Sequence, residues 1–313
     1  MNTELRDRVN RLLESKQITQ AELAKRIGYT SAAISTYKRG AYAADETAIE
    51  QALTEFFTLW DAQEDLREAS LNYGRRDSYI PITASESTYR LIKYAQIERK
   101  LVVIYGDTGV GKTKAAYKFV DDNPTGTVYI TSSPSCRSLR ATLKQLAREL
   151  RLPVRPTADM AAAIKEKLQS EGKLLIIDEA QFLTVSVVDE ISRWVDPDPG
   201  TGESRMAIAL IGNDGVLEKF DGRKDERRNQ NRGRMCLPLE VRSAKATMED
   251  VRRLFPVLAD RGETKELELL LAVARSVTGV RAAVEIYNSA INAGKVDRDT
   301  LLNFARQKRA LTA

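Results

Sequence analysis

The chain has 313 residues and a net charge of +5, and 42% of its residues are hydrophobic, which is enough for about two domains with cores of their own. It has no histidine, which excludes a histidine base, histidine metal ligands and a Ser-His-Asp triad, so any catalysis would use carboxylates, lysines, arginines and a metal ion. No apolar run approaches the roughly 18 residues of a membrane span, and the N-terminus has no signal-peptide core. The two cysteines, Cys136 and Cys236, lie far apart in the sequence. We therefore expect a cytoplasmic protein without a membrane partner.

The first 40 residues predict three short helices. Residues 1–15 carry one apolar face, Thr19 and Glu22 form a capping box for a second helix that Gly28 ends, and residues 31–40 form the third. Two short helices around a turn that contains glycine resemble the phage-repressor-like helix-turn-helix family, in which the second helix reads the major groove of DNA. The residues that this resemblance places against DNA are Thr30, Ser31, Ser35, Lys38 and Arg39. The alternative is a small helical module for docking or oligomerisation.

An acidic stretch at residues 45–70 is also expected to be helical, and it would complete the core of an N-terminal domain over residues 1–70. Residues 71–82 contain Gly, Asn, an arginine pair and Pro, and this composition predicts a linker. Thr83 and Glu86 form another capping box, which would open the first helix of the next domain.

A phosphate-binding loop follows the apolar run at residues 102–104. The pattern G-x-x-x-x-G-K-[ST] stands between a predicted strand and a predicted helix, as nucleotide binding requires. Its glycines allow backbone N–H groups to surround phosphate oxygens, and the helix N-terminus adds partial positive charge. Lys112 would reach the β- and γ-phosphates of ATP, and Thr113 would ligate Mg²⁺. The residues predicted to bind the nucleotide are Gly106, Asp107, Thr108, Gly109, Val110, Gly111, Lys112 and Thr113.

A carboxylate pair follows a second buried strand. Residues 173–180 read KLLIIDEA, which predicts a parallel strand with Asp178 and Glu179 at its carboxyl end, where ligands bind in an open α/β sheet. Asp178 would hold Mg²⁺ through water, and Glu179 would act as general base for the attacking water. The alternative is a solvated pair at a strand end.

Three later features extend this pattern. Asn213 follows a strand expected at residues 206–211, where an amide can orient the lytic water or simply form a turn. Residues 222–245 carry eight lysines and arginines against three acidic residues, which indicates either a solvated basic loop or an arginine finger for the nucleotide of a neighbouring subunit. The chain is helical from Thr247 onwards, and a glycine before Arg281 at a helix start would place that arginine on the γ-phosphate from a lid.

In this order, the elements resemble the AAA+ ATPases, which implies an α/β fold with a parallel-sheet core over residues 83–245 and a helical lid over residues 246–313. More narrowly, the chain resembles the Mu-type transposition B proteins, and more distantly the IstB-type helper ATPases. The likeness includes a helix-turn-helix segment before the ATPase, Gly-x-Thr-Gly-Val-Gly-Lys-Thr at 106–113, Ile-Thr-x-x-Pro-Ser-Cys at 130–136 and Ile-Ile-Asp-Glu-Ala at 176–180.

The resemblance implies a Mg²⁺-dependent, DNA-stimulated ATPase of a bacteriophage. Such a protein forms helical filaments or rings on double-stranded DNA with little sequence preference, and delivers target DNA to a transposase during DNA transposition and recombination. By the same resemblance, the nucleotide roles fall to Lys112, Thr113, Asp178, Glu179, Asn213 and Arg281. Arg232 is our choice for the arginine finger, with Arg228 and Arg234 as alternatives.

In this family, loops on the inner face of the oligomer meet the DNA backbone, and the corresponding loop follows the strand expected at residues 127–131. Its hydroxyls and arginines suit phosphate contact without base reading. The residues concerned are Ser133, Ser135, Arg137 and Arg140. The two arginines would alternatively only solvate the start of the next helix.

Two other functions remain open at this point. One is a helicase-loader ATPase of replication, and the other is a helix-turn-helix transcriptional regulator that uses ATP as a binding switch. The presence of Glu179 argues against a switch that never hydrolyses ATP.

Overall fold

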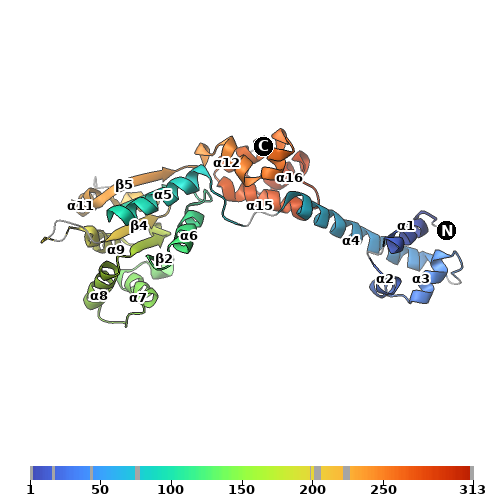
Figure 1. The fold of residues 1–313 in the computed structure, drawn as a ribbon, viewed down its shortest axis with the longest axis horizontal. Coiled ribbons are helices and arrows are strands. Elements are labelled where there is room, and N and C mark those ends of the chain that lie inside the picture. Colours follow the sequence, from blue (N-terminus) through green and yellow to red (C-terminus); the bar gives the residue numbers. More distant parts are fainter. Residues whose placement is uncertain are drawn as a thin grey trace. The chain divides into compact units, whose positions relative to one another are not determined.

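The computed structural model describes residues 3–15, 18–42, 45–74, 78–197, 199–200, 206–220 and 226–310, without the side chains of residues 66, 68–72 and 226–229. These residues form two compact units, which can be followed by colour in Figure 1. The first unit consists of Met1–Arg75 with Ala290–Val296, and the second of Arg76–Ser289 with Asp297–Ala313. Within the described residues, no helix is both long enough and apolar enough to cross a bilayer.

The N-terminal unit contains the helices α1 (Thr3–Glu14), α2 (Gln20–Ile27), α3 (Ser31–Lys38) and α4 (Glu46–Tyr73). The predicted capping box of α2 is confirmed, because Thr19 N donates to the Glu22 carboxylate (3.0 Å) and Glu22 N donates to Thr19 Oγ1 (3.3 Å). Gly28 ends α2 in the left-handed region, with φ 76°. The core of this unit contains Val9, Leu23, Ile34, Tyr37, Ile49 and Leu53.

Helix α4 is longer than the sequence indicated. It continues to Tyr73, so the first three residues of the linker predicted for 71–82 are helical. The helix stops before Gly74, which has a φ of 63° and supplies the left-handed conformation that commonly ends a helix. Residues 75–77, also assigned to the linker, lie outside the described part of the chain.

The second unit is built around a parallel sheet of β1 (Leu101–Gly106), β2 (Thr127–Thr131), β3 (Leu174–Asp178), β4 (Ala207–Ile211) and β5 (Met235–Val241). The strand order is β2-β3-β4-β1-β5, and every pair is parallel. The register aligns Ile104 of β1 with Ile211 of β4, and Ile177 of β3 with Leu210 of β4. The segments that follow β1, β3 and β4 therefore meet at one edge of the sheet.

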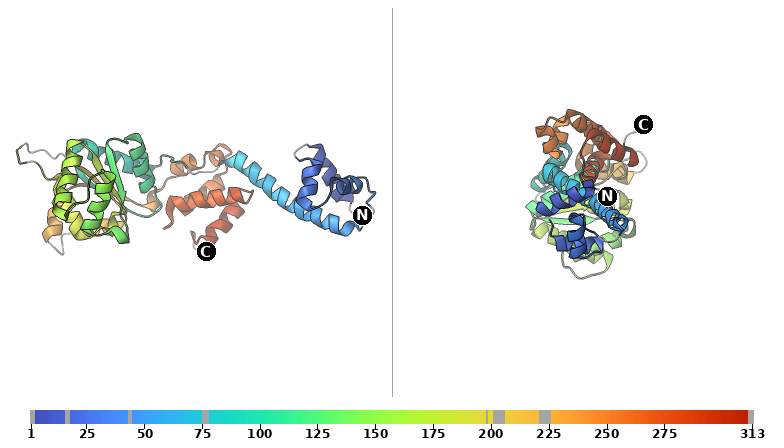
Figure 2. Two further views of the ribbon diagram at one scale, coloured as in Figure 1. Left: turned by 90° about the horizontal axis from the view of Figure 1, so that it is seen from below. Right: turned by 90° about the vertical axis from the view of Figure 1, so that its right-hand side faces the viewer.

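Helices cover both faces of this sheet (Figure 1, Figure 2). Because strand side chains alternate between faces, Val102 and Ile104 pack against α5 (Thr83–Glu98) and α6 (Lys112–Asp122). Leu101 and Val103 belong to the opposite core, which includes side chains from α7 (Leu139–Glu149), α8 (Thr157–Ser170) and α9 (Val185–Ser192). The predicted α/β fold with a parallel-sheet core is therefore confirmed, and the sheet has a hydrophobic core on each side.

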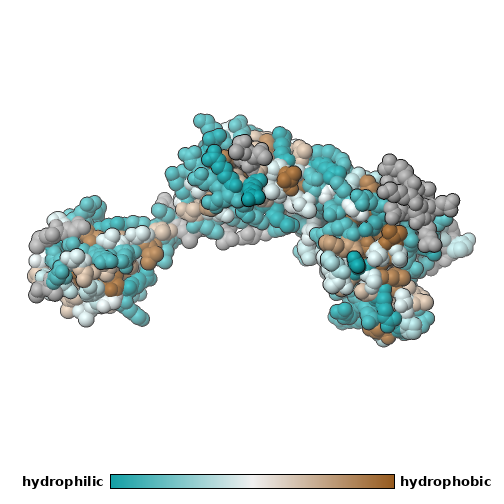
Figure 3. Space-filling view, turned by 180° about the vertical axis from the view of Figure 1, so that it is seen from behind, coloured by the Kyte–Doolittle hydropathy of each residue, from teal (hydrophilic) through white to brown (hydrophobic). Residues whose placement is uncertain are grey.

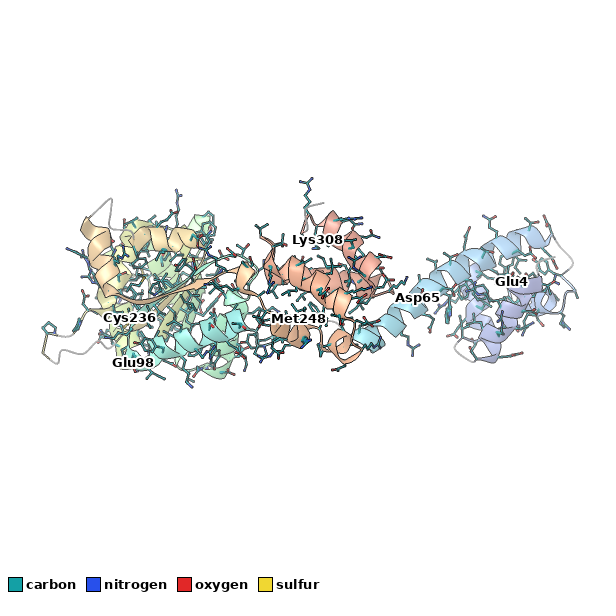
Figure 4. The ribbon with its side chains drawn as sticks, turned by 90° about the horizontal axis from the view of Figure 1, so that it is seen from above. Glu4, Asp65, Glu98, Cys236, Met248 and Lys308 are labelled. Carbon is teal, nitrogen blue, oxygen red and sulfur yellow. The ribbon has the colours of Figure 1, made fainter. Side chains whose placement is uncertain are left out.

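Strand β5 is an edge strand that lies beside α5. Figure 4 shows Cys236 on β5 close to this helix, which ends at Glu98. The Tyr94 hydroxyl on α5 lies 3.6 Å from the Cys236 sulfur. Two short helices, α10 (Asp214–Leu217) and α11 (Glu226–Arg234), connect β4 to β5.

The C-terminal helices follow β5 and are α12 (Met248–Leu254), α13 (Pro256–Asp260), α14 (Thr264–Arg275), α15 (Gly279–Asn292) and α16 (Arg298–Gln307). The first of them corrects one expectation. Thr83 and Glu86 do not form a capping box, because Thr83 is already the first residue of α5 and Glu86 instead pairs with Arg253 (3.2 Å). The α5 N-terminus is capped by the Asp250 carboxylate on α12, which accepts from Thr83 N (2.7 Å).

Candidate nucleotide-binding and hydrolysis site

The phosphate-binding loop connects β1 to α6 and has no room for larger residues at key positions. A Cβ on Gly106, whose φ is 126°, would lie 2.1 Å from the Val241 carbonyl oxygen of β5. A Cβ on Gly109, whose φ is 73°, would lie 2.8 Å from the Thr278 carbonyl oxygen. At Gly111 the chain enters α6 without any side-chain cap. Because glycine has no side chain to cap the helix, the N-terminus of α6 leaves space for phosphate oxygens, which favour such a position.

Lys112 is held at the start of this helix with its ammonium group inside the loop. The side chain is 8% exposed, and Nζ donates to the carbonyl oxygens of Gly106 (3.0 Å) and Asp107 (2.5 Å). Burial lowers the pKa of Lys112 below its usual value, against the opposing effect of Asp178 and other nearby carboxylates. A nearby anion stabilises the charged form of a buried lysine, so a bound phosphate chain would stabilise the Lys112 ammonium group.

A cavity of about 330 Å³ opens in front of the loop. Residues 108–114 form one wall, and the other walls come from the ends of β3 and β4, α15, residues between 78 and 85, and Leu254. The predicted site residues that line this cavity are Thr108, Gly109, Val110, Gly111, Lys112, Thr113, Asp178, Glu179, Asn213 and Arg281. The structure thus brings together residues that are up to 173 positions apart in the sequence, from Thr108 to Arg281.

Asp178 ends β3 and is 2% exposed. The Tyr129 hydroxyl donates to Asp178 Oδ2 (3.0 Å), and Glu179 N donates to Oδ1 (2.8 Å). Burial and the charge of Asp178 raise the pKa of Tyr129 above its usual value, so the hydroxyl stays protonated and can donate. Both oxygens of Asp178 are thereby held in place, which fixes the carboxylate that would hold Mg²⁺.

Glu179 follows in a strained backbone conformation, with a φ of 53° that few residues other than glycine adopt. Its carboxylate accepts a hydrogen bond from Gln181 Nε2. The Gln181 Oε1 atom in turn accepts from Asn213 N (3.3 Å). Sequence reasoning missed Gln181, because nothing in the local pattern places its side chain between two strand ends.

Asn213 stands where β4 ends, at the edge of the cavity. It lines the cavity, and its side-chain oxygen accepts from Gly215 N (2.9 Å), which caps the short helix α10. The turn-forming role is therefore present, and the residue also stands at the tip of β4 in the wall of the site.

Arg281 lies in the first turn of α15, directly on the phosphate-binding loop. Its backbone N–H donates to the Gly109 carbonyl oxygen (2.9 Å). A Cβ on Gly279, whose φ is 67°, would lie 2.8 Å from the Thr108 carbonyl oxygen. Two glycines thus allow the loop and the lid helix to meet backbone against backbone, which places Arg281 at the cavity.

Asp107 differs from the other predicted nucleotide ligands. Its carboxylate accepts from Ser243 N (2.8 Å) and Oγ (2.7 Å), and from Arg242 Nη1 (3.1 Å). Burial works against ionisation, but these hydrogen bonds hold the pKa of Asp107 below its usual value. Asp214, Asp107 and Glu240 raise the pKa of Arg242. The Asp107 side chain therefore anchors the loop to the end of β5, and any contact with nucleotide is left to its backbone.

The arginine-finger candidates lie on α11. The Arg232 side chain is exposed in the last turn before β5. Arg234 is engaged within the chain, because its guanidinium forms two hydrogen bonds with Asp196 (2.6 and 2.9 Å), which raise its pKa. The Arg228 side chain lies outside the described part of the chain.

The DNA-contact candidates of the N-terminal unit are on α3 and at its ends. Thr30 caps α3 through Ala33 N (3.2 Å), and Arg39 Nε donates to the Ser35 carbonyl oxygen (3.2 Å). Thr30, Ser31 and Arg39 are exposed, while Ser35 and Lys38 are half-buried.

The second set of DNA-contact candidates surrounds the start of α7. The Ser133 and Ser135 hydroxyls lie 3.0 Å apart, and Arg137 and Arg140 are exposed. Arg140 makes one long contact, 3.5 Å, to the Thr157 hydroxyl. Figure 3 shows hydrophilic residues over much of the surface in this region of α7 and α8.

The sheet order, the phosphate-binding loop, the carboxylates after β3 and the C-terminal helices define the class: the fold is that of an AAA+ P-loop ATPase. A family model described as "AAA domain" matches residues 96–220. Among solved structures, Cdc6p from Pyrobaculum aerophilum superimposes with a TM-score of 0.55 at 16% identity, covering 74% of this chain and 69% of that chain. The ORC1 protein of Aeropyrum pernix, in complex with DNA, gives 0.50 at 15% identity, covering 73% and 66%. These likenesses concern the fold alone.

Within this class, the chain is similar to the transposition B proteins of Mu-like phages, as its motifs indicated. The ATP-dependent target DNA activator B of Escherichia phage Mu is 25% identical over 283 residues, which is 89% of this chain and 85% of that protein. The activator B of Escherichia phage D108 is 26% identical over the same shares. The Mu-like prophage FluMu DNA transposition protein B of Haemophilus influenzae is 29% identical over 212 residues, or 67% and 69%.

Proposed function

We propose that this protein is an ATP-dependent target-DNA activator, which forms oligomers on double-stranded DNA and delivers that DNA to a transposase in the host cytoplasm. The observation that carries this proposal is the extent of the likeness to the two phage activators. It covers 89% of the chain, well beyond the 96–220 segment that marks an AAA domain. The regions outside the ATPase core are therefore also alike.

The site supports a defined division of labour in hydrolysis. Lys112 and the first-turn N–H groups of α6 would bind the phosphates, and Arg281 would contact them from the lid. Thr113 and Asp178 would hold Mg²⁺, whose charge offsets that of the phosphate oxygens. Glu179 would accept the proton of the attacking water, and Asn213 would help to orient that water.

Oligomerisation would complete the site. Arg232 is exposed in the last turn before β5, and among the described side chains it has no hydrogen-bond or ion-pair partner, whereas Arg234 pairs with Asp196. An arginine finger acts on the nucleotide of a neighbour. The ATPase rate per subunit should therefore rise with protein concentration and with DNA, and a rate independent of both would remove this role from Arg232.

The experiment that tests the proposal is Glu179→Gln. The variant keeps the shape of the side chain and loses the base, so it should bind ATP and assemble on DNA but hydrolyse at a rate lower by about 100-fold or more. Glu268→Gln is a matched control, because Glu268 is exposed on α14 outside the site. Unchanged turnover in Glu179→Gln would show that Glu179 is not the base.

A pull-down with the cognate transposase separates this proposal from its rivals. ATP-dependent capture of the transposase together with DNA is the expected result. Capture of a replicative helicase in its place would favour a helicase loader. DNA binding confined to one operator sequence, without transposase, would favour a transcriptional regulator.

A further inference from the structure

Gln181 occupies a position between two strand ends that neither its sequence context nor the family comparison assigns. It lies in the short turn after β3, and its side chain lines the nucleotide cavity. The amide nitrogen donates to the Glu179 carboxylate, and the amide oxygen accepts from Asn213 N (3.3 Å). One amide group thus connects the carboxylate after β3 with the backbone at the tip of β4.

The sheet register explains why a single side chain can bridge these points. Ile177 and Leu210 are directly paired, and Glu179 and Gly212 each lie two residues further along adjacent strands. Gly212 is buried, and a Cβ there would lie 2.3 Å from Gln181 Oε1. The absence of a side chain at Gly212 therefore gives the Gln181 amide its space.

We propose that Gln181 is a positioning residue for ATP hydrolysis, which holds the Glu179 carboxylate at the cavity and joins it to the loop that carries Asn213. The inference rests on the proposed role of Glu179 as general base. A glutamate side chain has several rotamers of similar energy, so a neighbour that fixes one of them keeps the base in reach of the attacking water. The link to Asn213 N means that the two groups acting on that water shift together.

Two variants test the two halves of the contact. Gln181→Met keeps the length of the side chain and removes both hydrogen bonds. Gln181→Glu keeps an oxygen for Asn213 N but replaces the donor to Glu179 with a like charge. Each should lower kcat by about 10-fold to 100-fold, the scale expected when a reacting group is misplaced. The dissociation constant of a fluorescent ATP analogue should stay within about 2-fold, because neither hydrogen bond involves the phosphate-binding loop.

Gln96→Met is the matched control. Gln96 is a half-buried glutamine of the same unit, on α5, and it donates to the Gly126 carbonyl oxygen (3.3 Å). Its replacement should leave kcat unchanged. If Gln181→Met lost its fold, measured by loss of analogue binding, Gln181→Leu would replace it, because it also removes both hydrogen bonds and leaves Gly212 and the packing around it unchanged.

A double-mutant cycle separates this inference from the proposed function. If Gln181 acts through Glu179, adding Gln181→Met to Glu179→Gln should change the residual rate by less than about 2-fold. Additive losses in the double variant would overturn the inference. A normal or raised kcat in Gln181→Met would also overturn it. In both cases Glu179→Gln would still identify the base, so the proposed function would stand. A normal kcat in Gln181→Glu would also overturn it, because only the Asn213 contact would then matter. Normal turnover in Glu179→Gln itself would refute the proposed base and the inference together.

Discussion

Replacing Asp250 should destabilise the second unit, because this residue connects the lid to the ATPase core. The Asp250 side chain on α12 is 3% exposed, and its carboxylate accepts four hydrogen bonds. Oδ1 accepts from Thr83 N (2.7 Å) and Oγ1 (2.8 Å) at the start of α5. Oδ2 accepts from Thr247 N (2.9 Å) and Oγ1 (2.9 Å) at the start of α12. One residue therefore caps α5 and completes the capping box of α12, whose N-cap is Thr247.

The magnitude follows from the lost cap of α5 and the lost half of the α12 capping box. Loss of one N-cap costs about 0.5–2 kcal/mol, so Asp250→Ala should cost about 3 kcal/mol in the free energy of unfolding. For a domain of about 150–250 residues this corresponds to a fall of roughly 6–12 °C in the unfolding midpoint of the second unit. Asp250→Asn keeps one acceptor oxygen and should cost about half as much. Differential scanning calorimetry of the full chain measures both variants.

The effect should also depend on pH. Burial alone would raise the pKa of Asp250, but the hydrogen bonds from Thr83 and Thr247 outweigh it and lower the pKa below its usual value. A carboxyl group with a lowered pKa in the folded state stabilises the protein above its unfolded pKa, about 3.9, and loses this effect as the pH falls through the folded pKa. The difference between wild type and Asp250→Asn should therefore be full at pH 7 and shrink below about pH 4.

Asp260→Ala is the control, because Asp260 is exposed on α13. This substitution should change the free energy of unfolding by no more than about 0.5 kcal/mol. An unfolding midpoint of Asp250→Ala within about 1 °C of wild type would refute the reasoning. A gap between wild type and Asp250→Asn that stayed constant down to pH 3 would refute its electrostatic part.

Three further outcomes are expected. Lys112→Ala should abolish ATP binding, measured by calorimetry, because it removes a charge-assisted phosphate contact. Wild-type ATPase activity in this variant would contradict the assignment of the phosphate-binding loop. Neutralising Arg137 and Arg140 together should weaken binding to all DNA sequences alike and reduce the slope of log affinity against log salt by about 0.9 per lost contact, whereas an unchanged slope would leave these arginines as solvated surface. Gly279→Ala should weaken ATP binding by about tenfold. The new side chain would clash with the phosphate-binding loop, and the left-handed backbone conformation would cost about 1–2 kcal/mol in alanine. Unchanged affinity would show that the lid contact does not support the loop.

The local elements of this protein were predictable because their signals are local. The strand expected at residues 127–131 and the capping box at Thr19 follow from local sequence, and the structure confirms both of them. The phosphate-binding loop was equally accessible, since strand, glycines and helix are contiguous. The order of the motifs then indicated the AAA+ fold, because parallel strands bring their carboxyl ends to one edge.

The partners of those elements were decided by tertiary structure alone. Asp250 caps α5 at Thr83, although the two residues are 167 positions apart in the chain. The local sequence predicted Glu86 for this role. Gln181 meets Asn213 because β3 and β4 are neighbours in the sheet. Asp107 carries a motif position but turns its carboxylate to Arg242 and Ser243 at the end of β5. Local sequence restricts backbone conformation and the buried face, whereas a hydrogen bond between distant segments depends on strand order and register, and these are set by how the whole core packs.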